Sequence, residues 1–238
     1  MDDSMTAAFV TGKWQLAQGY FAVEVEIESA SQLQPFDDGA LIDAVPRGHD
    51  GVVKTYPLFR SSSRRDAYVL GIRHDVSGEP AQRDFDIPWN HGDEILVGKP
   101  QTTPVTVDTK ARYILLGGGL GIAVIAGVAR KLASSGKSFE LHNFARTPAR
   151  AVFLEELCEL ERCGKIAHHF ERSAEQLARN ICHAISPTHA NSQIYCSGPP
   201  AFMDLIQQRA REWVYDANIH KIFLGDISRA KADPRMEA

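Results

Sequence analysis

The chain has 238 residues, which is room for one large domain or for two domains of ordinary size. Its net charge of −4 and the lack of a long basic run exclude the usual kind of nucleic-acid-binding surface. No apolar stretch is long enough to span a bilayer, and the polar, acidic N-terminus is unlike a secretory signal. Together these features predict a cytoplasmic globular protein.

The first hundred residues predict short antiparallel strands and no helix. Residues 21–28 alternate between apolar and polar side chains, which is the period of a half-buried strand. Further strands are predicted at 41–45, 52–56, 67–73 and 94–97, separated by stretches rich in Gly, Pro and Asp. Several short strands with regular turns are typical of a small barrel or sandwich, here expected over residues 8–108.

The second half alternates strands with helices. Strands are predicted at 112–116, 139–144, 165–170, 193–197 and 219–224, and helices at 121–135, 149–162, 174–184 and 199–214. Such alternation produces parallel strands with right-handed crossovers. We therefore expect a five-strand parallel α/β domain over residues 109–228, followed by a tail at 229–238. The Pro- and Thr-rich stretch 99–109 is the expected linker.

Two glycine turns stand where strands of this second domain end. In Gly118-Gly119-Leu120-Gly121-Ile122 an apolar strand turns directly into a helix. Glycine permits a tight turn, and a helix N-terminus offers free N–H groups to a phosphate. The second turn is Ser197-Gly198-Pro199, which also opens a helix. Since ligands bind beyond the carboxyl ends of parallel strands, we expect both turns to line one site, with Arg146 and Arg150 after a third strand.

These strand ends, in this order, resemble the ferredoxin–NADP reductase superfamily, and most closely its phthalate dioxygenase reductase and vanillate demethylase reductase branch. The first turn is similar to the family's G-G-I-G-I-T-P loop, and Tyr195–Pro199 is similar to its Y-x-C-G-P turn. In the first half, residues 54–58 fall where the family has R-x-Y-S-L, and residues 35–39 resemble its P-F-x-x-G turn. The resemblance covers about residues 12–225.

The resemblance implies an antiparallel flavin-binding barrel followed by a nicotinamide-nucleotide domain. The implied cofactors are FMN or FAD and NADH or NADPH, with electrons passing to a separate iron–sulfur protein or oxygenase subunit in a hetero-oligomer. The implied binding residues are Lys54, Tyr56, Pro57, Arg83, Gly118, Gly119, Gly121, Arg146, Gly198 and Pro199. A fused ferredoxin domain, common in this branch, is not expected here, because its cysteine run is missing.

The sequence departs from the family at the residues that touch the cofactors. Lys54 replaces an arginine that holds the flavin phosphate, and Pro57 replaces a serine that reaches the flavin ring. Ser197 stands at the position of the family cysteine beside the nicotinamide, and Cys196 comes one residue early, so it is expected to point into the core. The family has a phosphate-binding turn that contains Gly and Ser. The corresponding segment here contains neither residue, and Arg83 is the expected substitute.

These changes leave several functions open. The first is a flavin-dependent reductase component of a multicomponent oxygenase or demethylase. The second is a reductase-like interaction subunit that binds no flavin. A third is a free flavin reductase that uses flavin as a substrate. No metal site is predicted, because His168 and His169 are adjacent on a strand and face opposite ways.

Overall fold

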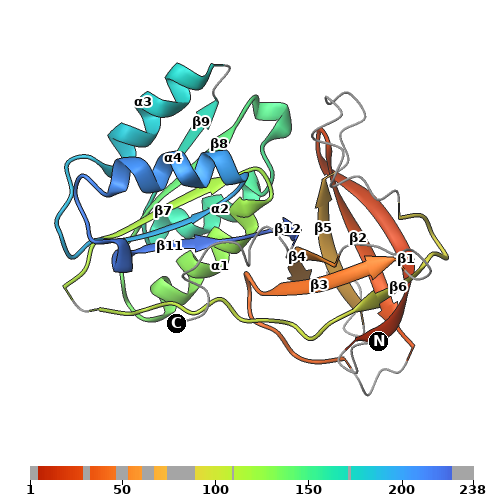
Figure 1. The fold of residues 1–238 in the computed structure, drawn as a ribbon. Helices are drawn as coiled ribbons and strands as arrows, with labels where there is room; N and C mark the ends of the chain where they lie inside the picture. Colours follow the sequence, from red (N-terminus) through yellow and green to blue (C-terminus); the bar gives the residue numbers. More distant parts are fainter. Residues whose placement is uncertain are drawn as a thin grey trace. The chain divides into compact units, whose positions relative to one another are not determined.

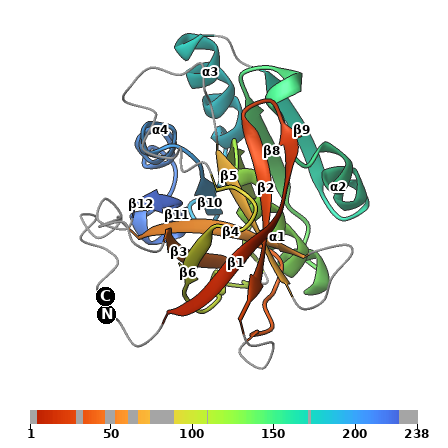
Figure 2. The same ribbon diagram turned by 90° about the vertical axis from the view of Figure 1, so that its right-hand side faces the viewer.

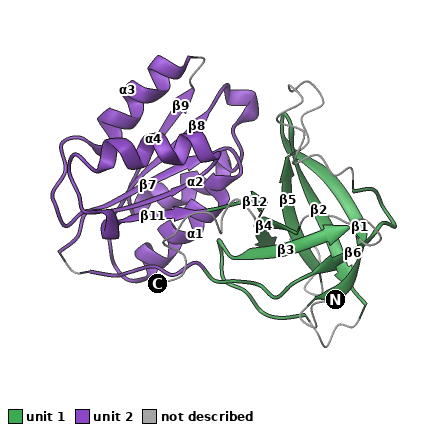
Figure 3. Cartoon of the chain, viewed as in Figure 1, with its two compact units in different colours: residues 1–102, 223–238 green, residues 103–222 purple. Residues whose placement is uncertain are grey.

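A computed structural model describes residues 5–28, 33–46, 53–60, 67–73, 89–108, 110–170 and 173–226. The chain forms two compact units, Met1–Thr102 with Phe223–Ala238, and Thr103–Ile222 (Figure 3). The sequence suggested a division near residue 108 and a second domain that runs to 228. In the structure the chain instead returns to the first unit at Phe223.

The first unit is a closed antiparallel barrel of six strands. They are β1 (Thr6–Ala17), β2 (Tyr20–Ile27), β3 (Leu41–Pro46), β4 (Lys54–Arg60), β5 (Ala67–Arg73) and β6 (Glu94–Val97) (Figure 1). The strand order is β4-β3-β6-β1-β2-β5, and β4 also pairs with β5, which closes the barrel. A short strand, β12 (Gly225–Asp226), adds to β4. The predicted barrel is confirmed.

The longest strand, β1, was not predicted from the sequence. Its pairing with β2 shifts register twice, between Val10 and Gly12 and again between Gln15 and Ala17. Each such irregularity inserts an extra residue and interrupts the alternation of side chains between the two faces. The period of two that identifies a strand is therefore broken along β1.

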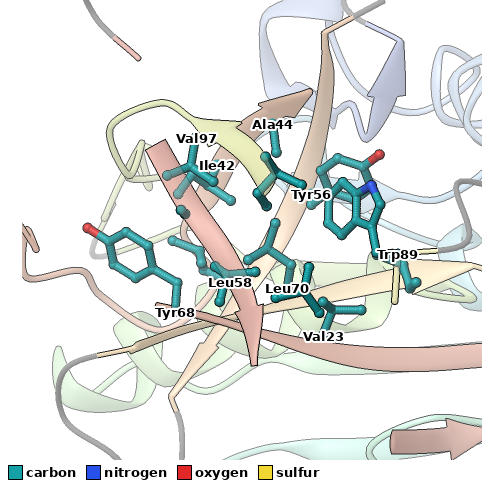
Figure 4. Packing of buried hydrophobic residues seen from close by; sticks show 14 of the residues in the cluster. Val23, Ile42, Ala44, Tyr56, Leu58, Tyr68, Leu70, Trp89 and Val97 are labelled. Atoms are coloured by element: carbon teal, nitrogen blue, oxygen red, sulfur yellow. The ribbon is translucent and has the colours of Figure 1, made fainter. Parts of the chain in front are cut away.

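The barrel core consists of aliphatic side chains with a few aromatic rings (Figure 4). The ring of Tyr56 lies against that of Trp89, with a centroid distance of 5.2 Å, and both side chains are buried. Tyr68 packs into the same cluster, and its hydroxyl accepts a hydrogen bond from the N–H of Gln34 at 2.8 Å. Tyr68 therefore ties the segment at residue 34 to the barrel.

The second unit is a five-strand parallel sheet with helices on both faces. Its strands are β7 (Tyr113–Gly118), β8 (Glu140–Ala145), β9 (Lys165–Phe170), β10 (Gln193–Ser197) and β11 (Ile219–Ile222), in the order β11-β10-β7-β8-β9. Its helices are α1 (Gly121–Ser134), α2 (Leu154–Cys158), α3 (Ala174–Ile185) and α4 (Pro200–Ala210) (Figure 2). Short 3₁₀ turns lie at Pro148–Arg150, Glu159–Arg162 and Asp216–Asn218. The predicted parallel α/β domain is confirmed.

The helix expected at 149–162 is broken into three short pieces. Phe153 has a φ of 63°, which is left-handed and ends any right-handed helix that reaches it. The helical segments Pro148–Arg150, Leu154–Cys158 and Glu159–Arg162 lie on either side of it. Within the described part of the chain, no helix is both long and apolar enough to cross a membrane.

Candidate functional site

The first glycine turn joins β7 to α1 at the carboxyl edge of the parallel sheet. Gly119 has a φ of 56°, a conformation that costs glycine little, and its N–H donates to the carbonyl of Phe144 at 3.3 Å. The N–H groups of Leu120 and Gly121 donate to no acceptor among the described residues, and no side chain caps the helix. This end of α1 therefore presents unsatisfied donors together with the positive end of the helix dipole.

The two glycine turns predicted from the sequence lie against each other. A Cβ at Gly121 would collide with the carbonyl of Ser197, and a Cβ at Gly198 would lie 3.2 Å from the carbonyl oxygen of Gly118. The absence of a side chain at Gly121 is thus required by protein packing, whether or not a ligand is bound. The sequence predicted these glycines for a tight phosphate-binding turn and did not reveal this packing.

Two neighbouring side chains at the end of β10 have opposite characters. Ser197 is fully buried, and its hydroxyl has no hydrogen-bond partner within the described chain. A buried hydroxyl without a partner is uncommon, and it leaves a hydrogen bond available for a polar atom of a ligand. Cys196 is fully buried on the other face, as expected, and burial raises the pKa of its thiol to about 12.

We expect the cysteines to differ sharply in reactivity. Cys158 and Cys163 are exposed, whereas Cys196 is buried and stays a thiol at neutral pH. Brief treatment of the folded protein with iodoacetamide at pH 8 should alkylate Cys158 and Cys163 and leave Cys196 unmodified, as read by peptide mass spectrometry. Urea should make all of them reactive. Rapid labelling of Cys196 in the folded protein would contradict its placement.

A third strand end, that of β8, lies beside the first turn through the Gly119–Phe144 hydrogen bond. Arg146 follows two residues later and is exposed, with no partner among the described residues. The hydroxyl of Thr147 is buried and unpartnered. Arg150 closes a 3₁₀ turn and is half-buried. The structure thus brings Gly118, Gly119, Arg146, Gly198 and Pro199 to one edge of the sheet.

The barrel residues predicted to hold a flavin lie on β4. One edge of β4 pairs with β3 along Lys54–Pro57. The other edge pairs with β5 from Leu58 onward and with β12 at Lys54 and Thr55. On this second edge, no ladder pairing with β5 or β12 includes Tyr56 or Pro57, although the ring of Pro57 lies beside Gly71 of β5. The hydrogen-bond ladder is therefore interrupted at these two residues, where Pro57 supplies no N–H.

The structure places Tyr56 in the barrel core. Its side chain is 4% exposed, its hydroxyl has no partner among the described residues, and burial raises its pKa. In this position the ring faces Trp89 rather than an open surface. Stacking of Tyr56 on a flavin stays a prediction, as does a role for Lys54, which is half-buried. Arg83 lies outside the described residues.

The sequence drew attention to His169 only beside His168, and it did not reveal that His169 on β9 meets His142 on β8. His142 Nδ1 lies 3.0 Å from His169 Nε2, and the His169 ring stacks on Phe144 at a centroid distance of 4.5 Å. Desolvation, and then the neighbouring His169, lowers the pKa of His142 to about 4. Its other ring nitrogen is buried without a partner among the described residues. His142 is therefore neutral in the folded protein at physiological pH.

This burial predicts a loss of stability in acid. His142 has a folded-state pKa of about 4 and an unfolded pKa of 6.5, so the unfolded chain binds its proton more tightly. The free energy of unfolding should fall by about 2 kcal/mol between pH 7.5 and pH 5 from this group alone. Urea unfolding at the two pH values measures the change.

The matched variant for this test is His142→Gln, which cannot titrate. It should reduce the pH dependence without abolishing it, because burial also lowers the pKa of His220. An unchanged pH dependence in the variant would contradict a neutral, buried His142.

Known proteins were compared with the chain as a whole. No family model matches it. It is 27% identical over 215 residues to the phthalate dioxygenase reductase of Burkholderia cepacia, a match that covers 89% of this chain and 66% of that protein. The solved structure of a phthalate dioxygenase reductase superposes with a TM-score of 0.69 at 26% identity, covering 93% of this chain and 68% of the other.

The predicted resemblance to the phthalate dioxygenase reductase branch is confirmed. A vanillate O-demethylase oxidoreductase of a Pseudomonas strain is 24% identical over 231 residues, covering 96% of this chain and 72% of that protein. The ferredoxin reductase of carbazole 1,9a-dioxygenase shares the fold, with a TM-score of 0.70 at 20% identity over 92% of this chain and 68% of the other. The chain spans 66% and 65% of the lengths of two phthalate dioxygenase reductases that it matches.

Proposed function

We propose that the chain is a flavin-dependent NAD(P)H oxidoreductase that supplies electrons to an oxygenase system. The observation that carries this proposal is the arrangement at the edge of the parallel sheet. There the unsatisfied amides of Leu120 and Gly121 lie at a turn that packs against the main chain of Ser197, whose buried hydroxyl has no partner among the described residues. The whole-chain similarity to phthalate dioxygenase reductases supports it.

Nucleotide binding is proposed because the β7–α1 turn has the features that a pyrophosphate site requires. A pyrophosphate needs backbone donors, a positive helix end and close approach, and the β7–α1 turn supplies all three. Arg146 is exposed at the neighbouring strand end and adds a positive charge. Ser197 would accept or donate one hydrogen bond to a polar group of the nicotinamide. No carboxylate lies in the first turn of α1 to oppose the anion.

The flavin half of the proposal rests on β4. The ladder is interrupted at Tyr56 and Pro57, two positions that the family resemblance assigns to flavin binding, and Lys54 begins the same strand. A bound flavin would accept hydride from the nicotinamide and release electrons singly. Because Pro57 has neither a hydroxyl nor an N–H, it cannot make the hydrogen bond to the flavin ring that the resemblance assigns to a serine at this position. FMN, the cofactor expected from the resemblance, remains a proposal.

The partner is inferred from the relatives' names. Reductase subunits of phthalate 4,5-dioxygenase and of a tert-butanol monooxygenase are among the similar proteins. We infer that electrons leave this chain for an iron–sulfur protein or an oxygenase subunit. The names give no support to the flavin-free subunit that the sequence leaves open.

The test is NAD(P)H-dependent reduction of ferricyanide by the purified chain. Assays are run with added FMN, with added FAD and with neither, each with NADH and with NADPH. Activity that the chain keeps after it is loaded with one flavin and desalted supports the proposal, and that flavin and nucleotide identify the cofactors. No activity above that of free flavin in any combination would contradict it. A rate that depends on flavin as a saturating substrate would instead favour a free flavin reductase.

A further inference from the structure

One aromatic side chain packs against the edge of the sheet at which nucleotide binding is proposed. Phe202 lies in the first turn of α4 and is buried, and its N–H donates to the carbonyl of Pro199 at 3.0 Å. The sequence assigned it no role, because it belongs to neither glycine turn. In the structure its ring reaches the ends of three neighbouring strands, β10, β7 and β8.

The ring of Phe202 touches both glycine turns. A Cβ at Gly198 would lie 2.8 Å from Cδ1 of Phe202, and a Cβ at Gly118 would lie 3.2 Å from both Cδ1 and Cε1 of the same ring. Both distances are shorter than an ordinary van der Waals contact. The ring therefore occupies the space that side chains at these two positions would need.

Phe202 also contacts the third strand end, that of β8. Gly118 and Phe144 are register partners on neighbouring parallel strands, so both face the same side of the sheet. The rings of Phe144 and Phe202 meet edge to face with a centroid distance of 5.3 Å, an arrangement that aromatic pairs prefer. Phe144 is buried, and the ring of His169 stacks on it. Phe202 thus connects the ends of β7, β8 and β10 by side-chain packing.

Two turns built from glycine depend on such packing. Glycine leaves a backbone more conformational freedom than any other residue, and Gly118 and Gly198 have no side chains of their own to fix the distance between the turns. The proposed dinucleotide would contact both turns at once, with its pyrophosphate at the β7–α1 turn and its nicotinamide near Ser197. A displacement of about 1 Å between two parts of a site can lower its efficiency about 100-fold.

We propose that Phe202 is a positioning residue, which sets the distance between the two glycine turns and thereby the affinity for the complete dinucleotide. This inference rests on the proposed nucleotide binding. Phe202 acts through Gly118 and Gly198 and contacts no ligand itself. Leucine at this position would leave part of the space of the ring empty, so the turns would no longer be held at one distance. A ligand that binds at only one of the turns would not be affected.

The test compares ligands that differ in the nicotinamide, by isothermal titration calorimetry of the full chain. The dinucleotides are NADH and NADPH, and the matching fragments without nicotinamide are ADP-ribose and its 2′-phosphate. Phe202→Leu should weaken binding of the preferred dinucleotide at least about tenfold and that of the matching fragment at most about twofold.

The matched control is Phe139→Leu. It makes the same substitution at another buried phenylalanine, just before β8 and therefore at the opposite end of that strand. Urea unfolding should show a comparable loss of stability, but the affinities for dinucleotide and fragment should stay unchanged. A second variant is Phe202→Met, whose long unbranched side chain can still reach both glycines. It should show a smaller loss, about threefold, again only for the dinucleotide, and it replaces the leucine variant if that chain does not fold.

The possible outcomes separate this inference from the proposed function. Equal losses for dinucleotide and fragment in Phe202→Leu would overturn the positioning role and leave nucleotide binding intact. Equal affinities of the two ligands for the unaltered chain would do the same, because the second turn would then contribute nothing. If neither ligand binds the unaltered chain, the proposed nucleotide binding fails, and the positioning role fails with it.

Discussion

Gly121→Ala is expected to destabilise the second unit by about 3 kcal/mol or more. The added methyl would overlap the backbone carbonyl of Ser197, and the nitrogen of Gly198 would lie only 2.7 Å away. Both contacts are with main chain, so no side-chain rotation relieves them. Either α1 or the end of β10 must move. Urea unfolding of the purified variant measures the loss.

A second glycine provides the control for this effect. Gly136 has a φ of 67°, but a Cβ there would meet nothing within 4 Å. Gly136→Ala should therefore lower the free energy of unfolding only by the cost of holding alanine in the left-handed conformation, about 1 kcal/mol. Equal losses in the two variants would contradict the close approach of α1 to β10. A folded Gly121→Ala chain should also lose nucleotide binding, because the two turns would separate.

Gly119→Asp is expected to lower kcat/KM for NADH by about 100-fold. A carboxylate at the N-terminus of α1 would stand where a pyrophosphate is proposed to bind, and like charges a few ångströms apart repel by about 3 kcal/mol in a partly shielded site. The change should be mainly in KM, because the altered interaction holds the nucleotide in both ground and transition states. Steady-state ferricyanide reduction with varied NADH measures it.

The control for charge is Gly119→Asn. Asparagine has nearly the same size and tolerates the positive φ of this residue as well as aspartate does. The two variants therefore differ only in the carboxylate. Similar kinetics for both would show that shape rather than charge limits the turn, and would contradict pyrophosphate binding at this helix end.

The parts of the fold that follow a regular period were accessible from the sequence. The strand–helix alternation of the second half predicted all five parallel strands, β7 to β11, because buried parallel strands are short apolar runs between turn residues. By contrast, β1 was missed because its two register shifts break the alternation. The left-handed Phe153 that interrupts the helix at 149–162 carries no sequence signal, because it is neither glycine nor asparagine.

The candidate site, too, could be predicted from the sequence only in part. The sequence located the two glycine turns and Arg146, since their residue types and positions after strands are local features. It did not reveal that Gly121 serves the packing of α1 on Ser197, or that β12 pairs with β4 at Lys54 and Thr55. Both depend on contacts between segments far apart in the chain. The burial of Tyr56 beside Trp89 is likewise a tertiary feature.

The most direct test of the proposed function is the visible absorption spectrum of the purified chain after incubation with FMN or FAD and desalting, before and after anaerobic addition of NADH or NADPH. We expect a retained flavin band that bleaches on addition of one nucleotide, because the chain would hold flavin beside β4 and accept hydride from the nucleotide bound at the β7–α1 turn. A colourless protein after desalting with either flavin, or a flavin band that no nucleotide bleaches, would contradict the account.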